Sequence, residues 1–254
     1  MVSFSTFERE FQPEYDATWQ HIYERHQNAV RIKRKAVALP NLEKIVSATL
    51  RISNRSSFHS MSLRDLSREA DLSMGALYSY IESKEQLSAM IVEHVLFLVE
   101  TVLAPPASLA STAQERLRWL LRTHVYLSEV MQPWFFFAYM EAKAFDQRVR
   151  RMAIDSELRT ERLFVECLTE GQAEGVFAPA DPVMIASLVK PLLQDWYLKR
   201  WKYRRRGIDP DDYADWVVGF VEAAASVPHP DCPGRPETGR AGVRHSRPPA
   251  TMPT

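Results

Sequence analysis

Apolar residues recur every three or four positions along most of the chain, which is the spacing of amphipathic α-helices. Stripes of this kind run through 41–53, 83–103, 112–131 and 211–226. The segment 182–198 differs because it is apolar nearly all round, so a helix there must be buried on more than one side. The pattern predicts an all-α protein.

Residues 62–81 have the pattern of two short helices joined by a tight turn. Ser62 is a suitable N-cap with Asp65 three residues later, and Ser73 can cap the second helix. Ser83 begins a third capping arrangement directly afterwards. Each helix start offers free backbone N–H groups and a positive dipole end to a phosphate. The segment therefore predicts a helix-turn-helix that binds DNA.

This segment resembles the TetR/AcrR transcription regulators. The run LYSYI at 77–81 is similar to the end of that family's recognition helix, and SKEQL at 83–87 is similar to the helix start that follows it. By motif, the resemblance covers roughly residues 39–99. It implies a fold in which three N-terminal helices bind DNA and a C-terminal helical bundle binds a ligand and dimerises.

Three positions depart from the family pattern. Ser57 and Asp71 stand where the family usually has turn glycines, and Ile81 replaces the common phenylalanine. Aspartate enters the left-handed backbone region more readily than most residues, so Asp71 is compatible with the same turn. Ser57 predicts a different local turn.

The helix pattern and the resemblance together predict four parts. Residues 1–38 form a helical and basic extension, and residues 39–99 form the DNA-binding domain. Residues 100–227 form the effector-binding and dimerisation domain. Residues 228–254 are rich in proline and arginine and lack apolar periodicity, which predicts a disordered tail.

The resemblance implies that the second helix of the motif lies in the major groove of operator DNA. Tyr78, Tyr80 and Lys84 match family positions that usually touch the phosphate backbone, and one of the two tyrosines is expected to pack inside the domain. The front of the helix carries no Arg, Asn or Gln for bidentate base pairing. The predicted DNA-binding residues are Ser62, Arg64, Ser73, Met74, Gly75, Ala76, Tyr78, Ser79, Tyr80 and Lys84.

The N-terminal extension is predicted to hold a helix bracketed by Pro13 and Pro40. The chain has 32 basic and 32 acidic residues, but from Arg25 to Arg55 eight basic residues face Glu43 alone, a local excess of seven. DNA affinity depends on local phosphate neutralisation, so a neutral chain with one basic end is compatible with binding. Two interpretations remain open: an arm that follows phosphates or the minor groove, or a solvated stretch.

The second half of the chain has the aromatic and methionine content of a pocket for an apolar ligand. A buried polar group near such a pocket needs a partner, so the histidines, Glu141 and Arg159 are candidate polar contacts. The predicted ligand-binding residues are His94, Trp119, His124, Trp134, Phe137, Met140, Glu141 and Phe164. The family expectation is a small, largely apolar effector that releases the protein from its operator.

Residues 199–206 contain six basic residues and two aromatics at the end of a predicted helix. Cations favour the negative end of a helix dipole and often stay solvated there. The alternative is an anionic head group: some TetR-like regulators respond to acyl-CoA thioesters, so an acyl-CoA or related lipid metabolite is one candidate effector.

The helices predicted at 182–198 and 211–226 resemble the pair through which this family forms homodimers as a four-helix bundle. The alternative is a monomer whose last two helices close its own core. The predicted dimerisation residues are Val189, Leu193, Trp196, Trp216 and Phe220.

Other classes of protein fit the sequence less well. A helical-bundle enzyme would need inward carboxylates with Glu-x-x-His spacing, a nucleophile elbow or a Gly-rich phosphate loop, and none of these is present. A metal sensor built from His94, His124 and Glu141 lacks ligand spacing. A DNA-binding protein without an effector would not need so large a bundle. No cofactor and no metal are expected.

The longest apolar burst, Trp134 to Met140, is too short to span a bilayer, and no basic and apolar leader opens the chain. Cys167 and Cys232 give neither a disulfide framework nor metal-ligand spacing. A cytoplasmic protein without a membrane partner is expected.

Overall fold

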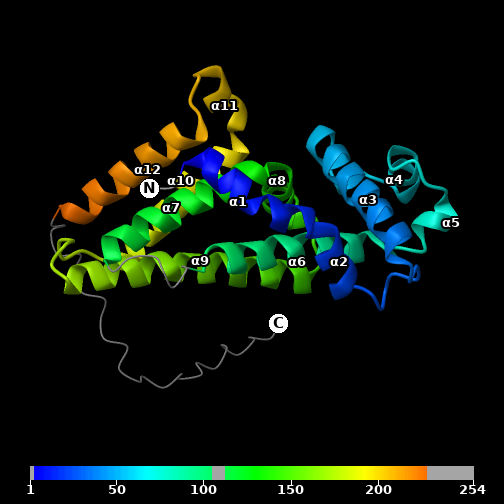
Figure 1. Cartoon of the computed structure of the whole chain (residues 1–254), viewed down its shortest axis with the longest axis horizontal. Helices are drawn as coiled ribbons and strands as arrows, with labels where there is room; N and C mark the ends of the chain where they lie inside the picture. The colour runs from blue at the N-terminus through cyan, green and yellow to red at the C-terminus, as the bar shows by residue number, and fades with distance from the viewer. Residues whose placement is uncertain (1–2, 105–111, 228–254) are drawn as a thin grey trace, which may run out of the picture.

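A computed structural model of the chain describes residues 3–104 and 112–227, and every regular element in these ranges is a helix, as predicted (Figure 1). The predicted disordered tail at 228–254 lies outside the described residues. The elements are α1 Phe4–Asp16, α2 Thr18–Arg25, α3 Lys35–Arg55, α4 Leu63–Glu69, α5 Met74–Leu77, α6 Lys84–Val102, α7 Ala113–Val130, α8 Gln132–Met140, η1 Ala142–Ala144, α9 Gln147–Ala173, α10 Pro182–Leu198, α11 Arg200–Arg205 and α12 Pro210–Ser226.

The predicted helix starts of the motif are present. Ser62 and Asp65 form a complete capping box on α4, and the Ser73 hydroxyl accepts the backbone N–H of Ala76 at 3.1 Å on α5. Asp71 lies between the two helices with φ +54°, so it takes the left-handed conformation that the turn requires. These local hydrogen bonds fix the angle between α4 and α5.

Helix α3 is longer than the sequence predicts, because it begins at Lys35 and contains Pro40. Pro13 likewise lies inside α1, so neither proline ends a helix, although the expected helix between them is present as α2. A proline removes one helix hydrogen bond but tertiary packing can offset that loss. Here Phe11 is buried two residues before Pro13, and Ala38 is fully buried two residues before Pro40.

Helix α6 leads from the predicted DNA-binding domain into the bundle, and the predicted boundary at 99/100 lies within its last turn. Helices α3, α4 and α5 occupy one end of the elongated molecule, whereas α7, α9, α10 and α12 form the other (Figure 1). Leu87, Met90 and Leu98 along α6 are buried in one core that extends through both parts. The two domains therefore share packing instead of being joined by a linker.

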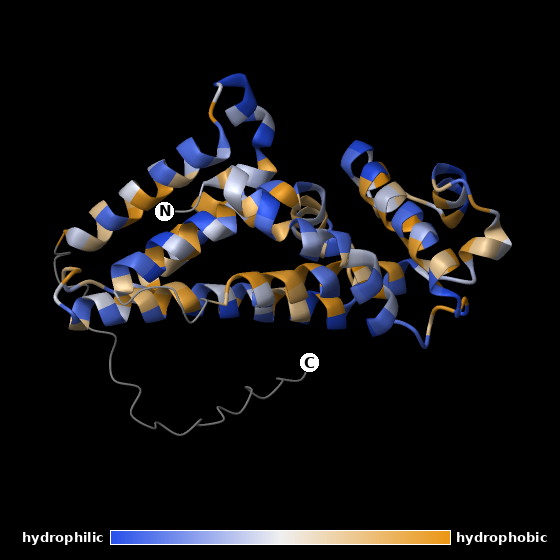
Figure 2. Cartoon of the chain, in the orientation of Figure 1, coloured by the Kyte–Doolittle hydropathy of each residue, from blue (hydrophilic) through white to orange (hydrophobic). Residues whose placement is uncertain are grey.

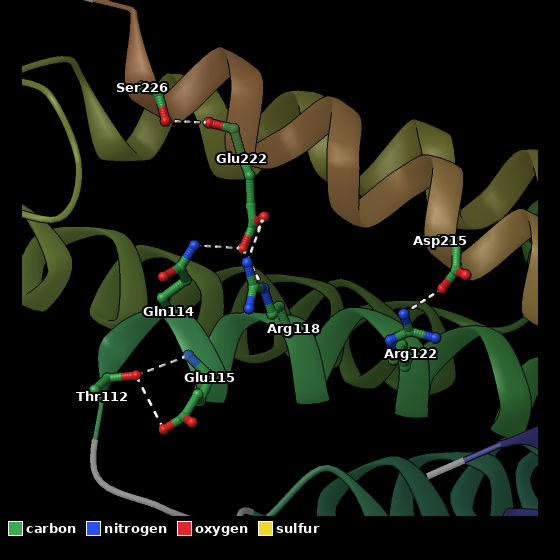
Figure 3. A network of polar contacts seen from close by, with 8 residues as sticks. All are labelled: Thr112, Gln114, Glu115, Arg118, Arg122, Asp215, Glu222 and Ser226. Atoms are coloured by element: carbon green, nitrogen blue, oxygen red, sulfur yellow. Dashed lines mark hydrogen bonds and ion pairs between the residues drawn. The ribbon is translucent and has the colours of Figure 1, made fainter. Parts of the chain in front are cut away.

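A ladder of polar contacts holds α12 against α7 (Figure 3). The Arg118 guanidinium binds the Glu222 carboxylate, and Arg122 pairs with Asp215 one turn further along α7. The Tyr126 hydroxyl, another turn along, donates to the Asp211 carboxylate at 2.5 Å. Because the contacts recur at helical spacing on both helices, they fix the register of α12 on α7.

The N-terminal extension is an integral part of the fold. Helix α1 lies against α7, and α2 packs on α3 and α6 (Figure 1). Helix α11 projects as the tip of a hairpin between α10 and α12 and is largely hydrophilic (Figure 2).

Candidate nucleic-acid interface and effector bundle

The single turn of α5 presents its front to solvent. Ser73, Gly75 and Tyr78 are exposed, and Met74 and Ala76 are half-buried. A Cβ added to Gly75 would meet nothing within 4 Å, so packing inside the protein does not require a glycine there. The small front is suited to close approach of another molecule.

The prediction that Tyr80 contacts DNA is wrong, because its side chain is buried. Its side chain is 2% exposed, whereas that of Tyr78 is 44% exposed. The Tyr80 hydroxyl accepts a 2.9 Å hydrogen bond from Asn41 Nδ2 and donates to the Val37 carbonyl at 3.4 Å. The ring therefore packs inside the domain and holds the chain after α5 onto α3. Periodicity could not choose between the two tyrosines, because α5 ends at Leu77, before both of them.

The remaining predicted DNA-binding residues surround this front. Ser62 and Arg64 are exposed at the start of α4, and Ser79 is half-buried. The Lys84 ammonium donates to the His59 carbonyl at 2.9 Å and lies 4.9 Å from the centre of the Phe58 ring. Burial lowers the pKa of Lys84. Through its contacts with His59 and Phe58, this side chain supports the turn before α4.

Much of the predicted basic excess is neutralised by acids from other parts of the chain. Arg51 and Arg55 both pair with Glu69. Lys35 pairs with Glu24, which lies before the basic run, and Arg25 pairs with Glu93 on α6. Counting charges along the sequence missed these partners because all three acids lie outside the counted window of residues 25–55.

Four cations in or near this region are available to bind an anion. Arg31, Arg34, Lys44 and Arg64 are exposed and form no ion pair among the described residues. The backbone N–H of Arg31 donates to the Ser79 carbonyl at 2.9 Å, which places Arg31 beside the turn at residues 78–80 that follows α5, here called the recognition turn. Arg31 is thus close to the end of α5, and exposed cations of this kind suit a phosphate backbone.

The structure separates the predicted ligand-binding residues into three places. His94 and Trp134 lie under the N-terminal extension, with ring centroids 5.3 Å apart. Phe137 packs on Phe58 at 5.2 Å, in the joint with the DNA-binding domain. Trp119, His124 and Phe164 belong to the α7 and α9 walls of the bundle, where the latter two are buried.

Glu141 and Met140 do not line an interior pocket. One Glu141 carboxylate oxygen accepts hydrogen bonds from the Ser53 hydroxyl at 2.8 Å and the Phe58 backbone N–H at 3.0 Å, which ties α8 to the end of α3. Met140 is 52% exposed. Arg159 pairs with Glu100 near the surface. The expectation that these side chains contact a buried ligand is wrong for Met140, and Glu141 and Arg159 already have partners.

The bundle contains a buried cation that the sequence analysis missed. Lys190 on α10 is buried among apolar residues and lies 3.2 Å from Glu157 on α9. His124 on α7 is also buried, and its Nδ1 has no hydrogen-bond partner. Burial, together with the charge of Lys190, holds the pKa of His124 well below its usual value, so the ring is neutral. A lysine inside an apolar stripe gave no signal that it faced inward.

Half of the basic cluster at 199–206 is neutralised. Lys199 and Lys202 pair with Asp195, and Arg200 forms a two-pronged pair with Glu129. Trp201 is 60% exposed, and the three arginines that follow Tyr203 face solvent. The first half of the cluster therefore forms ion pairs with α7 and α10, and the second half is an exposed cationic tip.

Two of the five predicted dimerisation residues are exposed. Trp216 is 78% and Phe220 is 61% exposed, one turn apart on α12. Val189, Leu193 and Trp196 are at most 1% exposed and pack inside the protomer, so their assignment to a contact between protomers is wrong. The cause is that α10 is apolar on every side, and its pattern does not reveal which side faces inward.

The outward face of α10 instead carries Met184 and Leu188, which are 56% and 62% exposed. Because α10 packs on α12, these side chains and the two exposed aromatics of α12 belong to neighbouring helices. An apolar surface of this kind on adjacent helices is unusual for a monomer.

Comparisons with known proteins agree with this architecture. Residues 45–90 match the family described as "Bacterial regulatory proteins, tetR family", and residues 110–224 match "Tetracyclin repressor-like, C-terminal domain". The chain belongs to the TetR family of transcriptional regulators.

Individual TetR relatives are distant in sequence. The HTH-type transcriptional regulator HbdR of Aromatoleum sp. (strain CIB) is 21% identical over 173 residues, covering 68% of this chain and 74% of HbdR. A bacterial regulatory protein in the tetR family from Rhodococcus RHA1 has a TM-score of 0.67 at 19% identity, covering 73% of this chain and 97% of that one. AibR in complex with isovaleryl coenzyme A and operator DNA has a TM-score of 0.59 at 17% identity, covering 74% of this chain and 100% of AibR. These structural likenesses establish the TetR fold.

Two further properties of this TetR chain concern the described residues alone. No helix within 3–104 or 112–227 has both the length and the apolar character needed to cross a bilayer. In the same ranges, no three His, Cys, Asp or Glu side chains are grouped so that they could hold a metal ion.

Proposed function

We propose that the protein is a homodimeric, cytoplasmic repressor without enzymatic activity that leaves its operator when a small, largely apolar effector binds. The observation that carries the proposal is the solvent-exposed front of α5, in which Gly75 is not required by internal packing. A surface residue whose type is not required by internal packing is a candidate for contact with a partner. The exposed cations beside this front supply the charge for phosphates.

Dimerisation is part of the proposal because operator recognition by this architecture uses two recognition helices about 34 Å apart. Met184, Leu188, Trp216 and Phe220 offer the apolar surface for such a pair. The same surface on a second copy would complete a four-helix arrangement about a two-fold axis.

The effector is proposed to enter the α7–α10 bundle and to contact Lys190 and His124. Lys190 is the buried cation of the bundle, and the unpaired Nδ1 of His124 gives a second polar atom. A ligand with an apolar body and a carbonyl or anionic group satisfies both. AibR, a structural relative, forms a complex with isovaleryl coenzyme A, and an acyl-CoA thioester fits this description.

The exposed arginines of the α11 tip are the proposed contact for the anionic part of such an effector. Arg204, Arg205 and Arg206 form no ion pair among the described residues. The paired cations of the cluster, Lys199, Arg200 and Lys202, are excluded from this role.

Thermal denaturation with isovaleryl-CoA, free CoA and free isovalerate tests the effector class. We expect the thioester to raise the Tm of the wild type and free CoA to raise it less. Lys190→Met should lose most of the response, and Arg151→Met on the outer surface of α9 is the matched control. No shift with any of the three compounds, or an equal response in Lys190→Met, contradicts the proposed contact.

Gel retardation of DNA from upstream of the gene that encodes the chain distinguishes a ligand-responsive repressor from a DNA-binding protein without an effector. A DNA-binding protein without an effector would retard this DNA equally with and without the thioester. Release at a thioester concentration that also raises the Tm supports a ligand-responsive repressor.

A further inference from the structure

The N-terminal extension lies outside both ranges that match the family, 45–90 and 110–224. It nevertheless contributes Phe11, Ile22 and Val30 to the buried core. A segment that buries this much apolar surface is held firmly in place. The extension can therefore transmit a displacement from one end to the other.

One end of the extension is attached to α12 and α7. The backbone N–H of Phe4 donates to a carboxylate oxygen of Asp211 at 2.9 Å, and the same oxygen accepts the hydroxyl of Tyr126. The rings of Phe4 and Phe7 lie 5.7 and 5.8 Å from the ring of Tyr126. Three groups from three helices thus meet at Asp211.

Asp211 is also the last contact in the polar ladder between α7 and α12. The ladder begins at Arg118 and Glu222 and continues through Arg122 and Asp215 (Figure 3). A shift of α7 along or away from α12 must rearrange these contacts. Because Asp211 belongs to both the ladder and the attachment of α1, such a shift also moves the start of the extension.

The middle of the extension crosses α8 and α6. Trp19 packs on Trp134 of α8 at 5.8 Å, and Thr18 lies 3.3 Å from His94 of α6. Further on, Arg25 donates to the Glu93 carboxylate at 2.9 Å. A cleft of about 630 Å³ borders this ion pair, and a second cleft of about 140 Å³ lies nearby and borders Arg25.

The other end of the extension reaches the recognition turn. The Tyr23 hydroxyl donates to the Lys33 carbonyl at 3.1 Å and so fixes the loop after α2. Within that loop, Val30 is fully buried, and the Arg31 N–H donates to the Ser79 carbonyl at 2.9 Å. Ser79 lies two residues after the end of α5.

We propose that residues 3–34 form a strap that couples the α7–α12 pair to the recognition turn of α5. The strap connects Asp211 to Ser79 through packed helices, and it acts in parallel with α6. A change in the α7–α12 register moves the strap, and the Arg31–Ser79 hydrogen bond passes that movement to the turn that faces DNA. The inference deepens the proposed function by giving a route for regulation, and it concerns the free protein, so its test needs neither operator nor effector.

Hydrogen–deuterium exchange of the full chain tests the strap. Phe7→Ala removes a ring contact at the Asp211 end and leaves the recognition turn untouched. We expect it to raise the exchange of the peptide covering 74–81 by about three- to tenfold, because the strap then holds Ser79 less tightly. Tyr15→Ala, also on α1 but 37% exposed, is the matched control and should leave that peptide unchanged.

A second pair of variants tests the attachment at Ser79. Arg31→Pro removes the N–H donor, and Arg31→Ala keeps it while removing the charge. Arg31→Pro should raise the exchange of 74–81, and Phe7→Ala should then add nothing further, since both act through one connection. Arg31→Ala should behave as wild type in exchange.

Three results would overturn the strap: unchanged exchange of 74–81 in Phe7→Ala, an equal increase in Tyr15→Ala, or independent, additive effects of Phe7→Ala and Arg31→Pro. If Arg31→Pro does not fold, the comparison of Phe7→Ala with Tyr15→Ala still decides. A protein that has the strap but does not bind DNA would pass this test and fail the retardation assay, so the two proposals are distinguishable.

Discussion

Asn41 Nδ2 donates a 2.9 Å hydrogen bond to the hydroxyl oxygen of Tyr80, and this contact joins the N-terminal half of α3 to the chain just after α5. Tyr78, two residues earlier, has 44% of its side chain exposed and forms no such bond. The two tyrosines that the family motif offers for DNA contact therefore have different roles. One supports the recognition turn, and the other is free to reach a phosphate.

Tyr80→Phe is expected to lower the free energy of unfolding by about 1 kcal/mol, because the Asn41 amide loses its acceptor. Operator affinity should change little, since the ring remains. Tyr78→Ala should do the reverse and weaken operator binding while stability stays within about 0.5 kcal/mol of wild type. Urea denaturation and DNA retardation of both variants measure the two effects.

The assignment of roles would be wrong if Tyr78→Ala bound DNA as tightly as wild type. It would also be wrong if Tyr80→Phe lost DNA binding without losing stability. Tyr80→Ala is unsuitable for this purpose because it removes a buried ring and destabilises the domain.

Gly75→Ala is expected to change operator affinity without lowering the stability of the protein. A Cβ at this position meets nothing within the protein, and alanine favours a helix over glycine by about 0.5–1 kcal/mol. The variant should therefore be as stable as wild type or more so. Operator affinity should fall, because the added methyl group occupies the space next to the groove. Equal affinity would show that the front of α5 does not approach DNA closely.

We expect the wild type to be a dimer at micromolar concentration and Trp216→Asp to be a monomer, because the substitution places a charge in the proposed apolar contact. Sedimentation velocity measures the oligomeric state. Tyr78→Asp, an exposed aromatic on the DNA-binding domain, is the matched control and should leave the dimer intact. A Trp216→Asp protein with the sedimentation coefficient of wild type would contradict the proposed face.

Acid should loosen the contact between the extension and α6. Burial and then the charge of the neighbouring His21 lower the pKa of His94 to about 4, from an ordinary value of 6.5. The unfolded chain therefore binds a proton at higher pH than the folded one, so the stability from neutral His94 is complete above pH 6.5 and is lost as the pH falls toward 4. The loss is on the order of 3 kcal/mol by pH 4.

The Tm of wild type and His94→Gln between pH 7 and 4.5 checks this expectation. Glutamine can keep a hydrogen bond to Thr18 but does not titrate. We expect the Tm of wild type to fall more steeply over this range than that of the variant. Parallel curves would mean that His94 is protonated without cost in the folded protein.

The sequence predicted the helices and caps well, because those features depend on nearby residues. The Ser62 and Asp65 capping box, the Ser73 cap and the left-handed Asp71 all follow from local chemistry. The helical-bundle class follows from periodicity alone. Local patterns, however, do not reveal which residue lies on the other side of a tertiary contact.

The predictions that failed depended on such partners. The side of α10 that faces inward is set by α7, α9 and α12, so Val189 and Trp196 could not be distinguished from Met184 and Leu188 by pattern. Lys190 is paired with a glutamate 33 residues earlier in the chain. The attachment of Arg31 to Ser79 uses backbone atoms, which have no signature in the sequence.

Selection of duplexes from a random DNA library by the full chain tests the central claim most directly. A dimeric TetR repressor with the proposed front should enrich one sequence with two half-sites about one helical turn apart, and Tyr78→Ala should bind it more weakly. Affinity should fall steeply between about 50 and 200 mM salt, because phosphate contacts dominate. Failure to enrich any sequence, or enrichment of a site that Tyr78→Ala and Gly75→Ala bind as tightly as wild type, would contradict the account.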